Sequence, residues 1–397
     1  MIPATVERRA RWVLDSIGAT DLGFGDDVPY DAAAWHQVDR GELPEGDDLA
    51  EAFFHLARVE ELDFPPDAHD RFSSEWSSLE PLDPPLERLR KKLGVQTPKR
   101  FVVALTHDVD SPWRWTPIGM RGAAARLKRH ALRARLGPAV REATGLAAVP
   151  LHRRRGTDPN WRFEEIVAEE RRRGASGSTF FVLAGHHDPH DGADPETYER
   201  LRPRLVETLL NAGAEVGLHG SYKAADDASR LAEEKAGLEA LAGPIKGHRY
   251  HYLRVNPHRN LAPLAQLGLT YDTTLGLPDT IGFRAGIAFP FRPWDFEREA
   301  PLDLLEIPLA AMDVTLAEER YLGLSARRAE RRLIRLLDWA AENGGAFSIL
   351  WHPDRFDPLT SAGWDRLYSR LLDGIRERGG ICTSAAELAS SHSTWSK

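Results

Sequence analysis

The pattern of hydrophobic and polar positions changes near residue 100. Before it, apolar residues recur at helical spacing in DLAEAFFHLARVEEL (48–62) and PPLERLRKKLGV (84–95), between stretches rich in acidic residues, proline and aromatic side chains. Apolar residues three and four positions apart lie on one face of a helix, which they bury against a core. We therefore expect residues 1–98 to form a small, mainly helical N-terminal accessory region.

Strand-forming residues open the rest of the chain, in FVVALTHDVD (101–110). After this run, short apolar stretches alternate with longer amphipathic ones, which predicts strands at 178–185, 214–221, 269–274, 302–310, 346–353 and 381–384, and helices at 161–174, 195–213, 228–243, 260–268, 325–345 and 361–380. Such alternation favours parallel strands joined by right-handed crossovers. We expect an α/β fold over residues 99–392, an incomplete (β/α) barrel of about seven units. The alternative is an open doubly wound sheet, but no glycine-rich phosphate motif follows the first strand.

A basic stretch interrupts this alternation at about 121–155. Arginine and lysine greatly outnumber acidic residues in RGAAARLKRHALRARLGPAVREATG and in LHRRR. We interpret it as an insertion, either a solvated helical excursion or a flexible loop. The functional alternative is a clamp for an anionic substrate or partner. Because the stretch supplies no apolar face of its own, we predict that it is dispensable for folding.

Composition narrows the class of protein. Apolar residues make up 42% of the 397 residues and charged residues 28%, which is ordinary for a globular enzyme, and the net charge of −8 gives no general attraction to nucleic acid. The sequence contains no apolar run long enough for a membrane span or a secretory signal, so we expect a cytoplasmic protein. The single cysteine, Cys382, has no intramolecular disulfide partner, and we expect it to pack in the core on the last strand.

Charged side chains end the first strand of the predicted barrel. Asp108 and Asp110 are two positions apart, so both side chains point to the same side, at the end of the strand where barrels keep their active sites. Two neighbouring carboxylates repel each other unless a cation or a proton lies between them, as a metal site with an adjacent base requires. His107 faces the other way, and we expect it to be packed or hydrogen-bonded behind the strand.

Two histidines follow later strands in the same manner. His219 ends AEVGLH and His352 ends AFSILWH, so both belong to the end of the barrel that carries the two aspartates. Between them, Arg249 in GHRYHYLR could pair with a carboxylate and fix its orientation. Three strands that each end in aspartate or histidine are hard to ascribe to packing alone.

The order of these motifs resembles that of the polysaccharide deacetylases, carbohydrate esterase family 4, in the branch whose first motif reads Asp-x-Asp. The likeness covers roughly residues 100–390, and STFFVL (178–183) and YDTTLG, with Asp272, also fit the pattern of this family. Residues 1–98 together with GFRAG (282–286) resemble a subgroup with an additional N-terminal region of unassigned role.

The resemblance implies a role for each motif residue. Asp108 would be the catalytic base, held by Arg249, and His352 the general acid, while Asp110 and His219 would bind a divalent metal, zinc or a similar ion. The chain departs from the family at Lys223, where a further histidine ligand is usual. Either His251 or His248 supplies the third ligand, or Asp110, His219 and water hold the metal, or no metal binds, as in the related allantoinase-like branch.

The predicted function is removal of an acetyl group from an N-acetylated or O-acetylated sugar or polysaccharide. Two alternatives stay open: hydrolysis of another C–N bond, as in a cyclic ureide amidohydrolase, and a catalytically silent carbohydrate-binding or assembly protein. Trp113, Trp115, Trp294 and Trp351 could stack on sugar rings, but core packing is the commoner role of a tryptophan.

Overall fold

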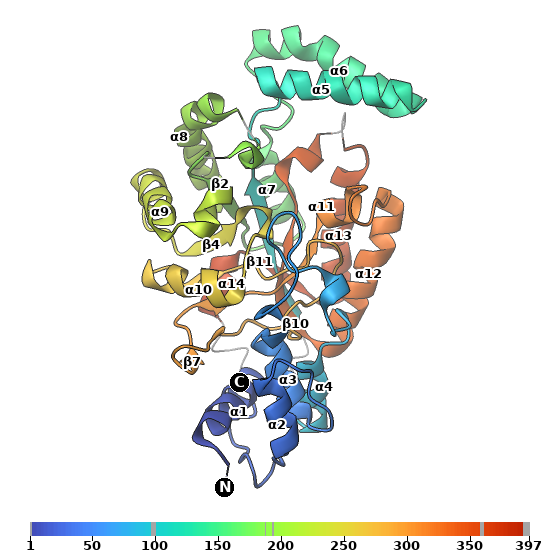
Figure 1. Cartoon of the computed structure of the whole chain (residues 1–397). Coiled ribbons are helices and arrows are strands. Elements are labelled where there is room, and N and C mark those ends of the chain that lie inside the picture. The colour runs from blue at the N-terminus through green and yellow to red at the C-terminus, as the bar shows by residue number, and fades with distance from the viewer. Residues whose placement is uncertain (1, 97–100, 187, 193, 358–360, 392–397) are drawn as a thin grey trace.

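A curled parallel sheet forms the centre of the computed structural model, which describes residues 2–96, 101–186, 188–192, 194–357 and 361–391 (Figure 1). Its strands run in the order β8-β5-β4-β3-β2-β1-β10-β9, and β11 pairs with β1. Their bounds are β1 Phe101–Val109, β2 Thr179–Leu183, β3 Glu215–Gly220, β4 Gly247–Tyr250, β5 Tyr271–Asp272, β8 Leu305–Glu306, β9 Leu309–Met312, β10 Gly345–Leu350 and β11 Ile381–Thr383. This topology confirms the predicted α/β fold with an incomplete barrel.

Helices pack around the outside of the sheet and explain why its strands are so apolar (Figure 1). Every residue of β1 and of β10 is buried, as expected where helices cover one face and the barrel interior the other. The helices between strands are α7 Phe163–Arg172, α8 Pro195–Asn211, α9 Ala228–Ala242, α10 Pro257–Gln266, α11 Asp313–Ala317, α12 Ala326–Asn343 and α13 Trp364–Glu377, and α14 Ala385–Ser390 follows β11. Cys382 is buried on β11, as predicted.

The predicted strand at 302–310 is instead divided into β8 and β9 by Ile307 and Pro308. Proline has no N–H to donate to a neighbouring strand. The Ile307 amide donates to the Asp272 carbonyl at 2.9 Å on one side, and the Pro308 carbonyl accepts from the Ser348 amide at 2.8 Å on the other. The strands at the two edges of the sheet, β8 and β9, are therefore consecutive in the chain. Ile307 and Pro308 connect them across the gap where the barrel is incomplete.

The N-terminal region is helical, as expected, and packs at the lower end of the barrel in Figure 1. It contains α1 Ala4–Ser16, α2 Ala32–Asp39, α3 Asp48–Leu56 and α4 Pro85–Lys92, of which the sequence pattern had indicated the last two. It shares a hydrophobic core with the barrel, where the Trp12 ring lies 5.0 Å from that of Trp294, beside the hairpin of β6 Trp294–Asp295 and β7 Ala300–Pro301. The predicted boundary at 98–99 lies outside the described residues.

The basic stretch forms a helical hairpin that stands off from the barrel at the top of Figure 1. Its helices are α5 Pro117–Leu132 and α6 Leu136–Arg155, so the hairpin begins before the predicted insertion. A small apolar cluster of Trp115, Ala123 and Val149 joins the two helices at their base, which corrects the expectation that the stretch has no apolar contacts of its own. None of the described helices combines the length and the apolar character needed to cross a bilayer.

Candidate active site

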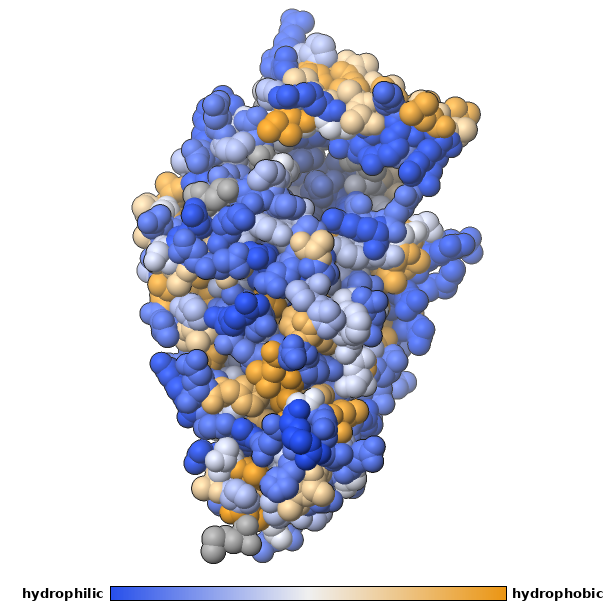
Figure 2. All heavy atoms as spheres, viewed as in Figure 1, coloured by the Kyte–Doolittle hydropathy of each residue, from blue (hydrophilic) through white to orange (hydrophobic). Residues whose placement is uncertain are grey.

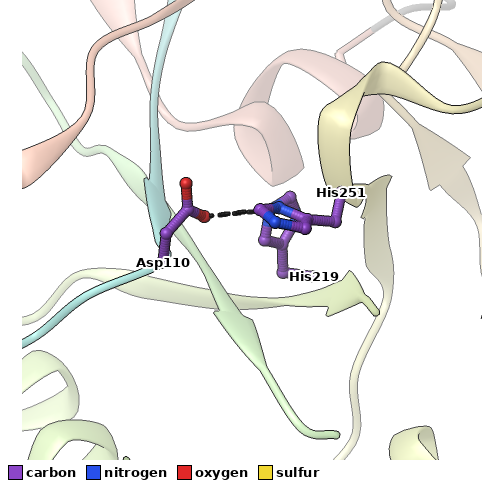
Figure 3. Close-up of side chains that lie close together, drawn as sticks. All are labelled: Asp110, His219 and His251. Carbon is purple, nitrogen blue, oxygen red and sulfur yellow. Dashed lines mark hydrogen bonds and ion pairs between the residues drawn. The ribbon is translucent and has the colours of Figure 1, made fainter. Parts of the chain in front are cut away.

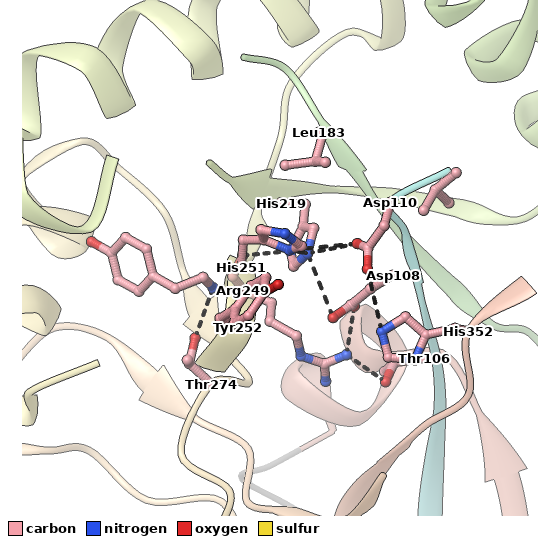
Figure 4. Close-up of polar contacts among 12 residues, drawn as sticks. Thr106, Asp108, Asp110, Leu183, His219, Arg249, His251, Tyr252, Thr274 and His352 are labelled. Atoms are coloured by element: carbon pink, nitrogen blue, oxygen red, sulfur yellow. Dashed lines mark hydrogen bonds and ion pairs between the residues drawn. The ribbon is translucent and has the colours of Figure 1, made fainter. Parts of the chain in front are cut away.

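The polar side chains that follow the parallel strands converge at the carboxyl end of the barrel (Figure 4). Asp108 lies on β1 with Asp110 directly after it, His219 lies on β3, Arg249 on β4 and His352 two residues after the end of β10. The structure thus brings together the residues that the sequence had indicated from separate motifs, because parallel strands place their carboxyl ends at one edge.

Asp108 is held in place by Arg249. The guanidinium Nη1 donates to Asp108 Oδ1 at 2.9 Å and to Thr106 Oγ1 at 2.9 Å, and Nε donates to the Thr273 carbonyl at 3.1 Å. Both charged side chains are buried. With Oδ1 bound to the arginine, Oδ2 stays directed at the centre of the site, 3.7 Å from His219 Nε2.

Asp110, His219 and His251 form a candidate metal site (Figure 3). His219 Nδ1 lies 2.9 Å from the Arg249 carbonyl and His251 Nε2 lies 2.8 Å from the His190 carbonyl. A carbonyl oxygen only accepts, so each of these nitrogens carries a ring proton, and in a neutral ring the other nitrogen keeps its lone pair. Those two nitrogens, His219 Nε2 and His251 Nδ1, face each other at 3.0 Å.

The Asp110 carboxylate lies beside both of these histidine nitrogens. Asp110 Oδ1 lies 3.3 Å from His219 Nε2 and 3.5 Å from His251 Nδ1, and within the described part of the chain this buried oxygen has no hydrogen-bond partner. Three acceptor atoms in such proximity repel one another unless a proton or a metal cation lies among them. Burial by itself lowers the pKa of His219, but for the same reason the neighbouring Asp108 and Asp110 carboxylates outweigh it and raise that pKa. In a tetrahedral site with bonds of about 2.0–2.1 Å, ligand atoms are separated by about 3.3–3.4 Å. The residues therefore fit a divalent ion of the zinc type.

A strained turn sets the position of His251. This residue begins a short 3-10 turn, His251–Leu253, in which Tyr252 and Leu253 have φ of 62° and 55°. Residues other than glycine seldom adopt these values, and such strain persists where surrounding contacts fix it, often at functional sites. Among the open alternatives for the third ligand, the structure places His251 beside Asp110 and His219.

His352 forms a pair with a buried carboxylate that the sequence interpretation missed. His352 Nδ1 lies 2.7 Å from Asp313 Oδ1, while Arg355 Nε donates to Asp313 Oδ2 at 3.1 Å. His352 Nε2 points to the site, 3.6 Å from Asp110 Oδ2. Burial by itself lowers the pKa of His352, but the Asp313 carboxylate, with Asp110 and Asp108, outweighs it and raises that pKa to about 10. His352 is therefore protonated at neutral pH.

Other polar residues singled out from the sequence lie away from this centre. His107 is buried behind β1, with Nε2 at 2.8 Å from Glu170 Oε1, which confirms its predicted position. His248 pairs with Asp272 at 2.6 Å, so the imidazole that could have replaced His251 is engaged elsewhere. Lys223 is half exposed and lies 3.4 Å from Asp188 Oδ2.

The N-terminal region also contributes to the rim of the site. Arg71 donates to the Tyr252 carbonyl at 3.0 Å and to the Tyr321 hydroxyl at 2.8 Å, and it lines a pocket shared with Asp108 and His352. Only the helical pattern of this region was informative, and nothing in it marked Arg71. Of the four tryptophans, Trp115, Trp294 and Trp351 are buried in packing, whereas Trp113 lines a cavity beside the site.

Comparison with known proteins finds a likeness of structure alone. No family model and no curated protein matches the chain. Among solved structures, one described as a polysaccharide deacetylase from Mycobacterium smegmatis is 18% identical, with a TM-score of 0.46 over 74% of this chain and 90% of that one. Another so described, from Pseudomonas aeruginosa PAO1, is 18% identical, with a TM-score of 0.42 over 58% and 71%. An allantoinase is 14% identical, with a TM-score of 0.48 over 84% and 98%.

At such identities and TM-scores the likeness concerns the course of the chain only. The chemistry proposed below rests on the geometry of the site itself.

Proposed function

We propose that this protein is a metal-assisted hydrolase of amide C–N bonds that removes the acetyl group from an N-acetylated sugar or glycoconjugate, with O-acetyl esters as a second substrate type. The observation that carries the proposal is the convergence of Asp110 Oδ1, His219 Nε2 and His251 Nδ1, three acceptor atoms 3.0–3.5 Å apart. This site lies between a buried carboxylate, Asp108, and a protonated imidazole, His352.

Asp108 and His352, which flank the metal site, each transfer one proton in the proposed reaction. Asp108 is an acceptor whose Oδ2 is directed at the site, so it takes the proton of the attacking water. His352 gives a proton to the leaving nitrogen, which would otherwise depart as a strongly basic amide anion. Zinc or a similar ion held by Asp110, His219 and His251 would supply positive charge that polarises the amide carbonyl and lowers the pKa of water.

A pocket beside the site has one apolar wall, which suits the methyl of an acetyl group. Leu253, Met312 and Leu350 form this wall, whereas Arg71, Arg320 and the site residues also line the pocket, whose volume is about 110 Å³. That is room for a small acyl group and too little for a sugar ring with its substituents, since whole-ligand pockets begin at roughly 300 Å³.

The test is metal content together with acetate release. We expect purified protein to bind about one zinc ion per chain by elemental analysis, and to release acetate from N-acetylated chitooligosaccharides or peptidoglycan fragments. His251→Ala should weaken zinc binding by roughly a hundredfold or more, because loss of a mere supporting contact already costs 10–100-fold. Lys223→Ala is the matched control and should retain the metal.

Two outcomes would contradict the proposal. Full zinc content in His251→Ala would show that the triad is not the metal site. An empty wild-type protein that binds oligosaccharide without releasing acetate would favour the carbohydrate-binding alternative.

We predict that Asp313→Asn shifts the pH dependence of activity. Asp313 raises the pKa of His352 more than any other neighbour does, so its neutralisation should lower that pKa. The acid would then lose its proton at lower pH, and the alkaline limb of kcat/KM should move toward neutral pH. Glu318→Gln is the control, because Glu318 accepts from Arg355 at 2.8 Å without contact to His352. An alkaline limb that stays in place in Asp313→Asn would remove His352 from the role of acid.

A further inference from the structure

A large basic cavity adjoins the catalytic pocket beneath the helical hairpin. Figure 2 shows hydrophilic residues around the opening between the hairpin and the barrel. The cavity has a volume of about 1120 Å³, against about 170 Å³ for the catalytic pocket, and Ser111, Gly192 and Asp354 line both. Since the catalytic pocket alone is smaller than most ligand sites, the body of a substrate extends beyond it.

The charge of this cavity is opposite to that of the whole chain. Among the described residues, eight arginines line it against five carboxylates, an excess of three positive charges, whereas the chain has a net charge of −8. The arginines come from the segment after β1, from both helices of the hairpin and the turn between them, and from the segments that follow α11 and β10. Such a concentration in a cleft attracts anions and raises their local concentration.

Two of these arginines are available to a ligand. Arg129 on α5 and Arg141 on α6 have no carboxylate within 4.0 Å among the described residues, and Arg141 Nε is buried without a hydrogen-bond partner. By contrast, Arg114 has a structural role. It pairs with Glu142 at 2.9 Å and with Asp357 at 3.0 Å, and these ion pairs connect the base of the hairpin to the barrel.

Two exposed ion pairs connect Glu319 to the far end of the hairpin, at the turn between α5 and α6. Arg133 and Arg135 contact Glu319 at 3.5 Å and 2.5 Å, and all three side chains are about half exposed. Exposed pairs of this kind contribute little to stability, so a stronger anion can replace Glu319. Guanidinium groups bind phosphate oxygens through paired, charge-assisted hydrogen bonds.

We infer that the cavity under the hairpin binds a phosphate or diphosphate group of the substrate, so that the protein acts on a phosphorylated acetamido sugar and not on a neutral polymer. This inference rests on the proposed function for the identity of the reaction, but the anion site is defined by the arginines alone. An excess of three charges matches a diphosphate or phosphate ester better than a single carboxylate. The phosphate can belong to a nucleotide or to a lipid carrier.

Anion binding can be measured without turnover. We expect inorganic pyrophosphate to bind the full-length protein in calorimetry, with an affinity that falls as salt is added. Arg129→Glu/Arg141→Glu should weaken this binding by at least about tenfold, because each lost guanidinium removes charge-assisted hydrogen bonds. The matched control is Arg121→Glu/Arg154→Glu, which changes the hairpin by the same charge at two positions that do not line the cavity, and it should bind like wild type. Arg129→Gln/Arg141→Gln repeats the test if the charge reversal unfolds the hairpin.

Pyrophosphate could also contact a bound metal, so Asp110→Asn is included, and in that background the arginine variants should still lose affinity. Equal pyrophosphate affinity in the cavity variant and the control would overturn the inference.

Activity assays then compare UDP-N-acetylglucosamine, a polyprenyl-diphosphate N-acetylglucosamine in detergent, and neutral chitooligosaccharides. Preferred turnover of either phosphorylated sugar, lost in Arg129→Glu/Arg141→Glu, supports the inference and identifies the source of the phosphate. Acetate release from neutral oligosaccharides that both double variants retain would refute the inference while the proposed function stands.

Discussion

Replacing Asp108 by asparagine should reduce kcat by about 10³-fold, within the range usual for loss of a general base, while the zinc content stays that of the wild type. Asparagine keeps the shape of the side chain and its contact with Arg249, now 2.9 Å from Asp108 Oδ1, but it cannot accept a proton from water. The residue is not one of the three that form the candidate metal site. The measurement is acetate release under saturating substrate, with elemental analysis on the same preparation.

Asp110→Asn is the informative partner of this variant. It should lose both metal and activity, because Asp110 Oδ1 is the acceptor that faces both imidazoles. If Asp108→Asn lost its metal and Asp110→Asn kept it, the roles of the two carboxylates would be exchanged. Near-normal acetate release by both variants would remove this site from the reaction altogether.

Glu61→Gln should destabilise the fold by about 3–5 kcal/mol, as expected when one partner of a buried ion pair is removed. The Glu61 carboxylate contacts Arg284 at 2.5 Å and Arg58 at 2.7 Å, and the three side chains are at most 1% exposed. Arg58 keeps Glu60 at 2.8 Å, but the buried Arg284 would lose its carboxylate partner and retain only neutral acceptors, the glutamine oxygen and two carbonyls at 3.3 Å. The measurement is urea unfolding at neutral pH, with Glu42→Gln as control. Its pair with Arg40 is exposed, and we expect no measurable change.

The same variant has a characteristic pH dependence. Burial raises the pKa of Glu61, but Arg284 and Arg58 outweigh it, and the net result is a lowered pKa. A lowered pKa in the folded state means that the ion pair stabilises the protein above the ordinary pKa of glutamate, and that this contribution is lost as the pH falls toward the lowered value. The difference between wild type and Glu61→Gln should therefore shrink in acid. Equal urea midpoints at neutral pH would show that the pair contributes nothing net.

The sequence was most informative where a polar residue follows an apolar run at the end of a strand. Asp108, His219 and His352 each follow an apolar run, and parallel pairing suffices to bring them together. The third metal ligand was left open because GHRYHYLR contains two histidines, and the choice between them depends on a backbone turn with positive φ at Tyr252 and Leu253. Neither residue type signals such a turn.

The sequence pattern did not indicate Asp313, for a related reason. The predicted strand stopped at Ala310, whereas β9 runs from Leu309 to Met312, so Asp313 follows its last residue. With the correct strand end, Asp313 would have fitted the rule that indicated the other site residues. Arg71 had no such signal, because it reaches the rim from a loop of the N-terminal region, and only long-range packing determines where that loop lies.

The position of β1 in the sheet affects how the protein can form during its synthesis. β1 is the first strand to be made, yet its first six residues pair with β10, from Phe101 with Gly345 to Thr106 with Leu350, and β11 pairs with Val102–Ala104. These partners leave the ribosome about 240 residues later, which at 5–20 residues per second is a delay of roughly 10–50 s. Until then this apolar strand has exposed edges, a template for unwanted pairing with other nascent chains. We therefore expect fragments that end before β10 to aggregate, and the active site to assemble only after β10 has been synthesised.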